Sequence, residues 1–237
     1  MKCISLTIFA ALSLTGGLAS AQQQLGDHGT FAIGVDRIFG YTSYTESYDN
    51  TSTTGARTSY EHTTSNFALL GRAQSLTVAQ VPRLSFDVFL GPGISLGGSI
   101  MYDHYSSSSK TAGIESPNKP SVGLWLFSPR VGFAHMFTPQ IGIWPRAGVM
   151  YTHLSSDSSY TDINGAQLTA NTSAGALFYT MDVNLVITPV PHVGFTVGPT
   201  LDYLLSMSQS STPPDTTPQT NQKEHALGIQ AGFLGWF

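Results

Sequence analysis

Apolar residues alternate with small or polar residues over several long stretches of this chain. Residues 141–151, 177–187 and 192–205 (the last reads HVGFTVGPTLDYLL) each place an apolar side chain at about every second position. A period of two is typical of a β-strand, because successive side chains point to opposite faces of the sheet. Runs of ten or more residues with this period therefore predict long strands with one apolar face and one small or polar face.

The connections between these stretches alternate between long and short. The four long connections are polar and cover about residues 45–77, 106–119, 155–173 and 206–223. The three tight connections contain turn-forming residues and are Gly91-Pro92-Gly93, Thr138-Pro139-Gln140 and Pro189-Val190-Pro191. Short turns at one end and long loops at the other are typical of an up-and-down outer-membrane barrel, in which the short turns are periplasmic.

This alternation predicts an all-β fold, an eight-stranded antiparallel transmembrane β-barrel with long extracellular loops. The expected strands are residues 29–44, 78–90, 94–105, 120–137, 141–154, 174–188, 192–205 and 224–237. An even number of strands places both termini on the periplasmic side. Residues 59–75 leave an alternative open, because they could form a further strand. Since an odd count would reverse the short turns, we assign them to the first outer loop, as a strand extension past the membrane.

The N-terminus predicts export from the cytoplasm. Lys2 precedes an apolar run, residues 4–14, and the small-residue site Ala19-Ser20-Ala21 follows. This order predicts a signal peptide over residues 1–21, cleaved before Gln22, then a short periplasmic segment over residues 22–28 and the barrel over residues 29–237. The chain's one cysteine lies inside the predicted signal peptide, so we expect no disulfide in the mature protein.

Composition excludes some function classes. Charged residues make up 10% of the chain, whereas soluble domains contain about 25%. The net charge of −4 and a pI near 5.9 leave no basic surface for nucleic acid. We find no nucleotide, phosphate or metal-binding motif, and we expect no cofactor.

The last thirteen residues, HALGIQAGFLGWF, form an alternating strand that ends on an aromatic residue. Phe233 and the terminal Phe237 resemble the C-terminal assembly signal of Gram-negative outer-membrane proteins. The whole chain resembles the small eight-stranded barrels, the membrane domain of OmpA and the OmpX group. The resemblance implies a monomer in the outer membrane with a structural or surface-interaction role. Its implied partners are membrane lipid or lipopolysaccharide, the barrel assembly machinery and an unidentified extracellular ligand. A soluble β-sandwich would also have amphipathic strands, but the low charge, the signal peptide and Phe237 oppose it.

Strand parity points a set of charged side chains into the lumen. Parity also points Asp103 inward, and the others are Asp36, Arg83, Asp87, Arg130, Arg146, Asp182 and Asp202. Since an eight-stranded barrel is just wide enough for side chains to fill, we expect these residues to form an ionic network that plugs it. A selectivity ring in a narrow channel is the alternative. Proline precedes three of the arginines, at 82, 129 and 145, which predicts local breaks in the strand ladder.

Two short patterns raise the question of catalysis. Gly93-Ile94-Ser95-Leu96-Gly97 matches the G-x-S-x-G nucleophile pattern, but that pattern needs a strand-to-helix elbow and here it opens a strand. His153 and Ser155 share the outer face of one strand and are similar to the His-x-Ser pair of outer-membrane lipid A deacylases. Those enzymes also need a carboxylate, yet residues 174–188 contain no glutamate, and we place Asp157 and Asp162 in a loop. We therefore expect a protein that is not an enzyme, with lipid A modification by His153 and Ser155 as the alternative.

Overall fold

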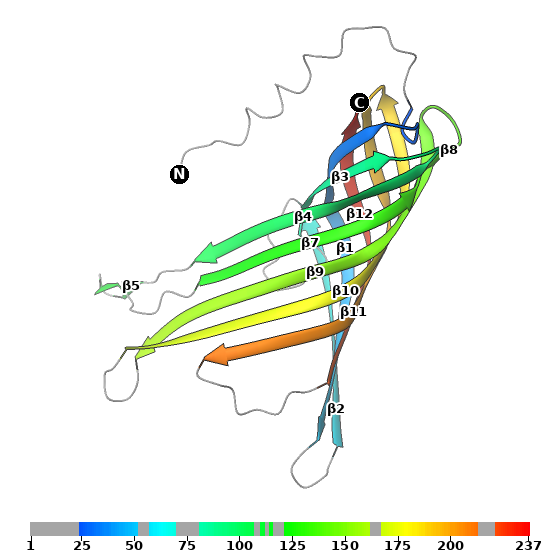
Figure 1. Cartoon of the computed structure of the whole chain (residues 1–237). Helices are drawn as coiled ribbons and strands as arrows, with labels where there is room; N and C mark the ends of the chain where they lie inside the picture. The colour runs from blue at the N-terminus through cyan, green and yellow to red at the C-terminus, as the bar shows by residue number, and fades with distance from the viewer. Residues whose placement is uncertain are drawn as a thin grey trace.

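The computed structural model describes residues 24–51, 57–69, 81–106, 110–111, 114–115, 121–161, 167–212 and 221–237, so the predicted signal peptide lies outside the described residues. These ranges form twelve strands (Figure 1). They are β1 (Phe31–Thr51), β2 (Arg57–Leu69), β3 (Arg83–Phe89), β4 (Ile94–Ser106), β5 (Lys110–Thr111), β6 (Ile114–Glu115), β7 (Ser121–Phe133), β8 (His135–Met136), β9 (Ile141–Thr161), β10 (Gln167–Val190), β11 (Val193–Thr212) and β12 (Asn221–Trp236). Within these ranges, no helix is long and apolar enough to cross a membrane.

Eight of the strands form a closed antiparallel ring. The order is β1, β3, β4, β7, β9, β10, β11, β12 and back to β1. β12 closes the ring against β1, with Ala32 opposite Trp236, and the backbones of Phe31 and Phe237 exchange two hydrogen bonds. The predicted eight-stranded barrel is therefore confirmed. β8 pairs with β9, and β5 and β6 form a separate two-stranded sheet.

Several strands extend further than the apolar alternation predicted. β9 continues to Thr161, β10 begins at Gln167, and β11 continues to Thr212. The expected loops over residues 155–173 and 206–223 are shorter for this reason, and Asp157 lies in β9 rather than in a loop. The backbone ladder continues in register through polar residues, with Asn171 opposite both Asp157 and Thr212. The apolar pattern reports contact with hydrocarbon, whereas strand length depends on backbone pairing, so the two end at different places.

A β-bulge in β1 changes which strand lies beside it. β1 pairs with β3 up to Asp36 opposite Arg83, and it pairs with β2 from Phe39 opposite Leu69. β2 and β3 both run antiparallel to β1, and each pairs with a different part of it. β2 therefore takes the place of β3 beside the outer part of β1, and the ring stays at eight strands. The strand extension predicted within residues 59–75 is therefore β2, over residues 57–69. β2 pairs with β1 from Phe39 onward, just beyond the part of β1 that pairs with β3.

The predicted breaks at proline occur at both sites within a strand. Pairing between β7 and β9 is interrupted at Ser128 and Pro129. On the same side of β9, pairing stops at Arg146 opposite Gly132 and resumes at Ile143 opposite His135, so it skips Pro145, which stays paired with Val183 on β10. Register shifts occur elsewhere, in β1 between Val35 and Phe39 and at two points between β10 and β11.

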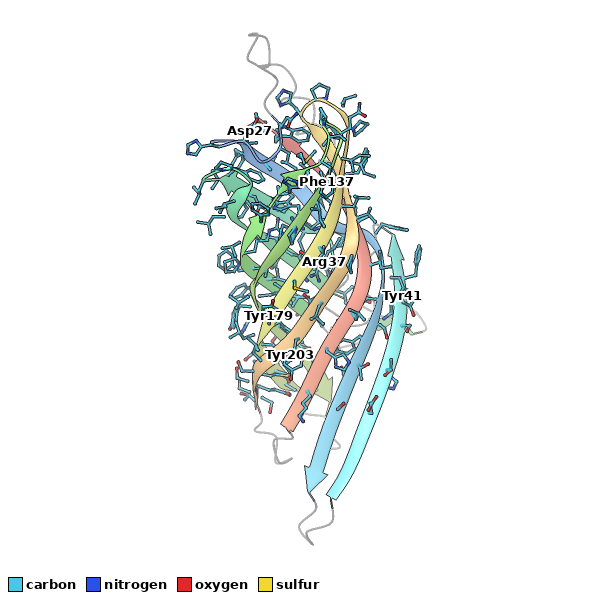
Figure 2. The ribbon with its side chains drawn as sticks, turned by 90° about the vertical axis from the view of Figure 1, so that its right-hand side faces the viewer. Asp27, Arg37, Tyr41, Phe137, Tyr179 and Tyr203 are labelled. Atoms are coloured by element: carbon cyan, nitrogen blue, oxygen red, sulfur yellow. The ribbon has the colours of Figure 1, made fainter. Side chains whose placement is uncertain are left out.

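Apolar side chains cover the outside of the ring, with aromatic residues at both ends. The exposed aromatic residues at the periplasmic end include Phe31, Phe133, Phe137 and Phe237. Those at the outer end include Tyr41, Tyr102, Trp125, Tyr151, Tyr179 and Tyr203. Figure 2 shows Arg37 between the level of Phe137 and the level of Tyr179 and Tyr203. An apolar band between two aromatic girdles is the outer surface of a transmembrane barrel.

A turn before β1 closes the periplasmic end. Leu25 is 2% exposed and packs in an apolar cluster with Phe89, Trp144 and Trp236. The turn is tied to the barrel by backbone hydrogen bonds from Gly93 N–H to the Gly26 carbonyl (2.8 Å) and from Gly29 N–H to the Phe89 carbonyl (2.8 Å). The segment expected to be a short periplasmic extension is therefore, over residues 24–30, a cap on the barrel.

Candidate functional site

A layer of buried ions crosses the lumen at mid-height. The structure places seven of the predicted lumen residues in it, and it adds Arg37. Four arginines and four aspartates result, so the formal charges of the layer balance. The members are Asp36, Arg37, Arg83, Asp87, Arg130, Arg146, Asp182 and Asp202. A balanced set is what a narrow lumen requires, because an uncompensated buried charge is costly.

Arg130 on β7 joins two aspartates from the neighbouring walls. Its Nη1 donates to Oδ2 of Asp36, and its Nη2 donates to Oδ2 of Asp87 at 2.6 Å. Its Nε donates to Oδ1 of Asp87 at 3.4 Å, so the guanidinium holds Asp87 by two nitrogens. Bidentate arginine–carboxylate pairs combine charge with fixed geometry, so they are among the strongest hydrogen-bonded ion pairs in proteins.

Arg37 forms the second centre of the layer. Its Nη1 donates to Oδ2 of Asp202 at 2.6 Å, and its Nη2 donates to Oδ1 of Asp202 at 2.9 Å. The Thr180 hydroxyl donates to the same carboxylate at 2.6 Å, and Asp182 lies 3.5 Å from Arg37 Nη2. Regular alternation would point Arg37 outward, because Asp36 precedes it and points inward. The bulge, with φ of 60° at Arg37, turns both side chains into the lumen.

Arg146 on β9 links the two centres. Its Nη2 lies 3.3 Å from Oδ1 of Asp36 and 3.4 Å from Oδ2 of Asp182. Its guanidinium carbon lies 4.8 Å from the centre of the Trp144 ring, in the geometry of a cation–π contact. Seven of the eight side chains are thus one connected network rather than separate pairs, and Arg83 lines the same cavity as Arg37 and Arg130.

Two glycines give the arginines their room. A Cβ at Gly148 would lie 2.1 Å from the Pro129 carbonyl oxygen, and a Cβ at Gly132 would lie 2.9 Å from Cγ of Arg146. The strands approach each other too closely at these points for a side chain.

Apolar side chains fill the lumen on both sides of the ionic layer. The periplasmic cluster contains Leu25, Ala32, Phe89, Ala134, Trp144, Val186, Leu234 and Trp236. The outer cluster contains Val81, Met101, Leu126, Met150, Phe178 and Leu204. Two small cavities adjoin the ionic layer, and each has about 10 Å³ of space for water, about the room of a single water molecule. The sequence predicted a plug made of charged residues alone. The observed plug has three layers, with the ionic layer between two apolar clusters.

Among the described residues, which do not include Asp162, the catalytic patterns do not assemble into a catalytic site. Ser95 of the G-x-S-x-G pattern is fully buried, and its hydroxyl accepts a hydrogen bond from Trp144 Nε1 at 3.1 Å. His153 packs against the ring of Trp125, and the Ser155 hydroxyl donates to the Gly123 carbonyl at 3.4 Å. In the part of the chain that the structure describes, His153 has no carboxylate partner. The same residues hold no group of three or more side chains that could bind a metal ion.

The ring divides into two groups of strands at its outer end. Pairing between β11 and β12 ends at Tyr203 opposite His225, whereas β10 and β11 remain paired to Thr212. β3 ends its pairing with β4 at Leu84 opposite Ile100. Figure 1 shows the outer parts of β4, β7, β9, β10 and β11 inclined to the left, whereas β1 and β2 point downward. Within the described ranges, Leu204–Ser210 of β11 therefore pairs with β10 on one edge only.

The C-terminal residues lie on the outer surface at the periplasmic end. Phe237 is exposed, and its ring centre lies 5.7 Å from that of Phe31. Phe233 is half-buried and lies opposite both Val35 and Phe195. Their predicted role as an assembly signal remains a prediction.

Solved outer-membrane proteins are similar to this chain at low identity. No protein-family model matches the chain, and no curated protein matches it. The outer membrane protein OprG from Pseudomonas aeruginosa shares 12% identity over 92% of this chain and 99% of its own, with a TM-score of 0.46. A major outer membrane protein from Thermus thermophilus shares 12% over 84% of this chain and 99% of its own (TM-score 0.44). The outer membrane protease OmpT from Escherichia coli shares 11% over 92% and 99% (TM-score 0.43).

The geometry of the molecule defines its class. A closed antiparallel ring, an apolar outer band with two aromatic girdles and a charged lumen together make it a β-barrel of the cell outer membrane. Its ring of eight, short periplasmic turns and filled lumen resemble the small barrels of the OmpA membrane domain and OmpX.

Proposed function

We propose that this protein is a closed membrane anchor that presents strand edges to extracellular proteins. The observation that carries the proposal is the one-sided pairing of Leu204–Ser210 beyond the outer girdle. An edge strand offers a row of backbone donors and acceptors to an extended partner segment, which can add as a further strand.

The composition of this edge supports the proposal. Residues 206–210 read SMSQS, without charge and without proline, and all five are exposed. Natural proteins usually protect such edges with lysine, proline or a bulge. The register with β10 shifts at Leu205, but Ser206–Ser210 beyond this bulge stay in register with β10. This uncharged exposed edge is therefore suited to pairing with another chain.

A peptide selection tests the proposal. A phage library of random ten-residue peptides is panned on the protein in lipid nanodiscs. We expect enrichment of extended sequences with alternating β-branched residues, bound at least tenfold more weakly by Ser208→Lys. Thr172→Lys is the matched control, because Thr172 lies on β10 between β9 and β11. The proposal fails if no peptide is enriched, or if both lysine variants weaken binding equally.

Two further measurements separate the alternatives. A change in the mass spectrum of extracted lipid A on expression of the protein would support an enzyme with His153 and Ser155. Ion conductance in planar bilayers would support a narrow channel. We expect neither, because His153 has no carboxylate partner among the described residues and the lumen is filled.

A further inference from the structure

Three cross-strand rows on the outside of β4, β7 and β9 form a graded patch. The lowest row is Ile100, Phe127 and Tyr151, which lie opposite one another. The middle row is Tyr102, Trp125 and His153, and the upper row is His104, Gly123 and Ser155. From the lowest row to the upper row, the exposed side chains thus change from largely apolar to aromatic and then to the imidazole of His104 and the hydroxyl of Ser155.

The patch lies at the outer membrane interface. Ten residues separate Ile141, at the periplasmic end of β9, from Tyr151. At about 3.3 Å per residue and a tilt of about 45°, this distance is about 23 Å along the membrane normal. Tyr151 therefore lies near the upper limit of the hydrocarbon band, and the middle and upper rows lie at the level of the lipid headgroups.

Trp125 is the centre of the patch. Its ring centre lies 5.1 Å from that of Tyr151 and 5.7 Å from that of His153. Trp125 is 42% exposed, whereas Trp144 and Trp236 are 1% and 4% exposed inside the lumen. One aromatic face of this cluster is therefore available to a lipid headgroup, and it carries the one exposed tryptophan of the chain.

Gly123 keeps the space between His104 and Ser155 free of a side chain. A Cβ at this position would lie 3.0 Å from the Ser155 hydroxyl and 3.9 Å from Nδ1 of His104. The His104 imidazole can donate or accept a hydrogen bond, and the Ser155 hydroxyl, which donates to the Gly123 carbonyl, can accept one.

The chemistry of the patch matches a neutral sugar better than a phosphate. Phosphate is bound by arginine, lysine or clustered backbone N–H groups, and the three rows contain no arginine or lysine. A pyranose ring has an apolar face of C–H groups that packs on an aromatic ring, and hydroxyls that bond to serine and histidine. We propose that this patch binds the sugar headgroup of an outer-leaflet glycolipid, with the ring on Trp125, the hydroxyls at His104 and Ser155, and an acyl chain along Ile100 and Phe127.

Lipid retention in native mass spectrometry tests the proposal. The whole protein is placed in phosphatidylcholine nanodiscs that contain either monogalactosyl diacylglycerol or phosphatidylglycerol. We expect at least fivefold preferential retention of the galactolipid. Trp125→Ala and Gly123→Val, which places a branched side chain between His104 and Ser155, should each remove that preference. Tyr203→Ala is the matched control, because Tyr203 is an exposed aromatic of the same girdle on β11.

Tryptophan fluorescence supplies a second readout. The galactolipid should shift the emission of the wild-type protein and leave Trp125→Phe unchanged, since the other two tryptophans are buried. Heat-modifiable migration on a gel verifies that each variant is folded, and Ser155→Ala replaces any variant that is not. Equal retention of both lipids, preference for phosphatidylglycerol, or an unchanged preference in folded Gly123→Val would each overturn the proposal.

Discussion

Arg37 and Asp202 form a two-pronged ion pair across the lumen, with N–O distances of 2.6 and 2.9 Å, although 165 residues separate them in the chain. The pair depends on the bulge in β1, because a regular strand would point Arg37 to the lipid. A residue other than glycine with φ of 60° is strained, so the ion pair holds Arg37 in a backbone conformation that it would otherwise avoid.

Two replacements of Arg37 should therefore distinguish the contribution of the ion pair to stability from the cost of backbone strain. Arg37→Ala leaves Asp202 buried without its main partner, and we expect a loss of about 3–5 kcal/mol in unfolding free energy. Arg37→Gly loses the same pair but accepts positive φ, so it should be less destabilised, by about 1 kcal/mol. Urea unfolding in detergent measures both, and equal stability of the two variants would contradict the strain argument.

Two further arginines of the layer should also contribute to stability. We expect Arg130→Ala and Arg146→Ala to lower the unfolding midpoint in detergent, because each leaves buried aspartates with fewer donors. Lys110→Ala, outside the ring in β5, should leave the midpoint unchanged. An arginine variant as stable as the wild type would show that water in the lumen replaces the lost contacts.

The three-layered plug should block ion flow. Wild-type protein in a planar bilayer should show almost no conductance, because apolar clusters lie on both sides of the ionic layer. Arg130→Ala alone should stay closed for the same reason. A steady open current through the folded wild-type barrel would mean that the lumen is wider in the membrane than in this structure.

The cap before β1 should add measurably to stability. Leu25→Ala removes a buried side chain from the periplasmic cluster, and we expect a loss of about 2–5 kcal/mol. Leu90→Ala is the matched control, since Leu90 is 56% exposed in the nearby turn. Thermal unfolding followed by gel migration compares the two, and equal effects would argue that the cap does not stay in place.

Deleting Phe237 should lower the yield of assembled protein in cells. The deletion removes the exposed terminal aromatic residue and two backbone hydrogen bonds to Phe31 at the closing seam. Refolding of purified protein in detergent separates the two effects, because a recognition defect lowers yield only in cells. An unchanged folded yield in vivo would count against an assembly signal at this residue.

The sequence alone determined the strand number, the end at which the short turns lie, and the face of seven lumen charges. These properties are local. A period of two assigns faces within one strand, and Gly and Pro mark the tight turns, so no knowledge of distant residues is needed. Asp182 and Asp202 are assigned correctly for this reason, since each lies in an uninterrupted run of alternation.

Only the tertiary structure decided the position of Arg37, the Leu25 cap and the true lengths of β9, β10 and β11. The bulge places two extra residues of β1 against β12 between Val35 and Phe39, so it turns Arg37 inward while Thr42 keeps the face that alternation gives it. It occurs where the neighbour of β1 changes from β3 to β2. Strand length depends in the same way on a partner continuing in register, as Asn171 does beside Asp157 and Thr212. Each of these features depends on pairing or packing between distant segments, and alternation within a single strand carries no information about it.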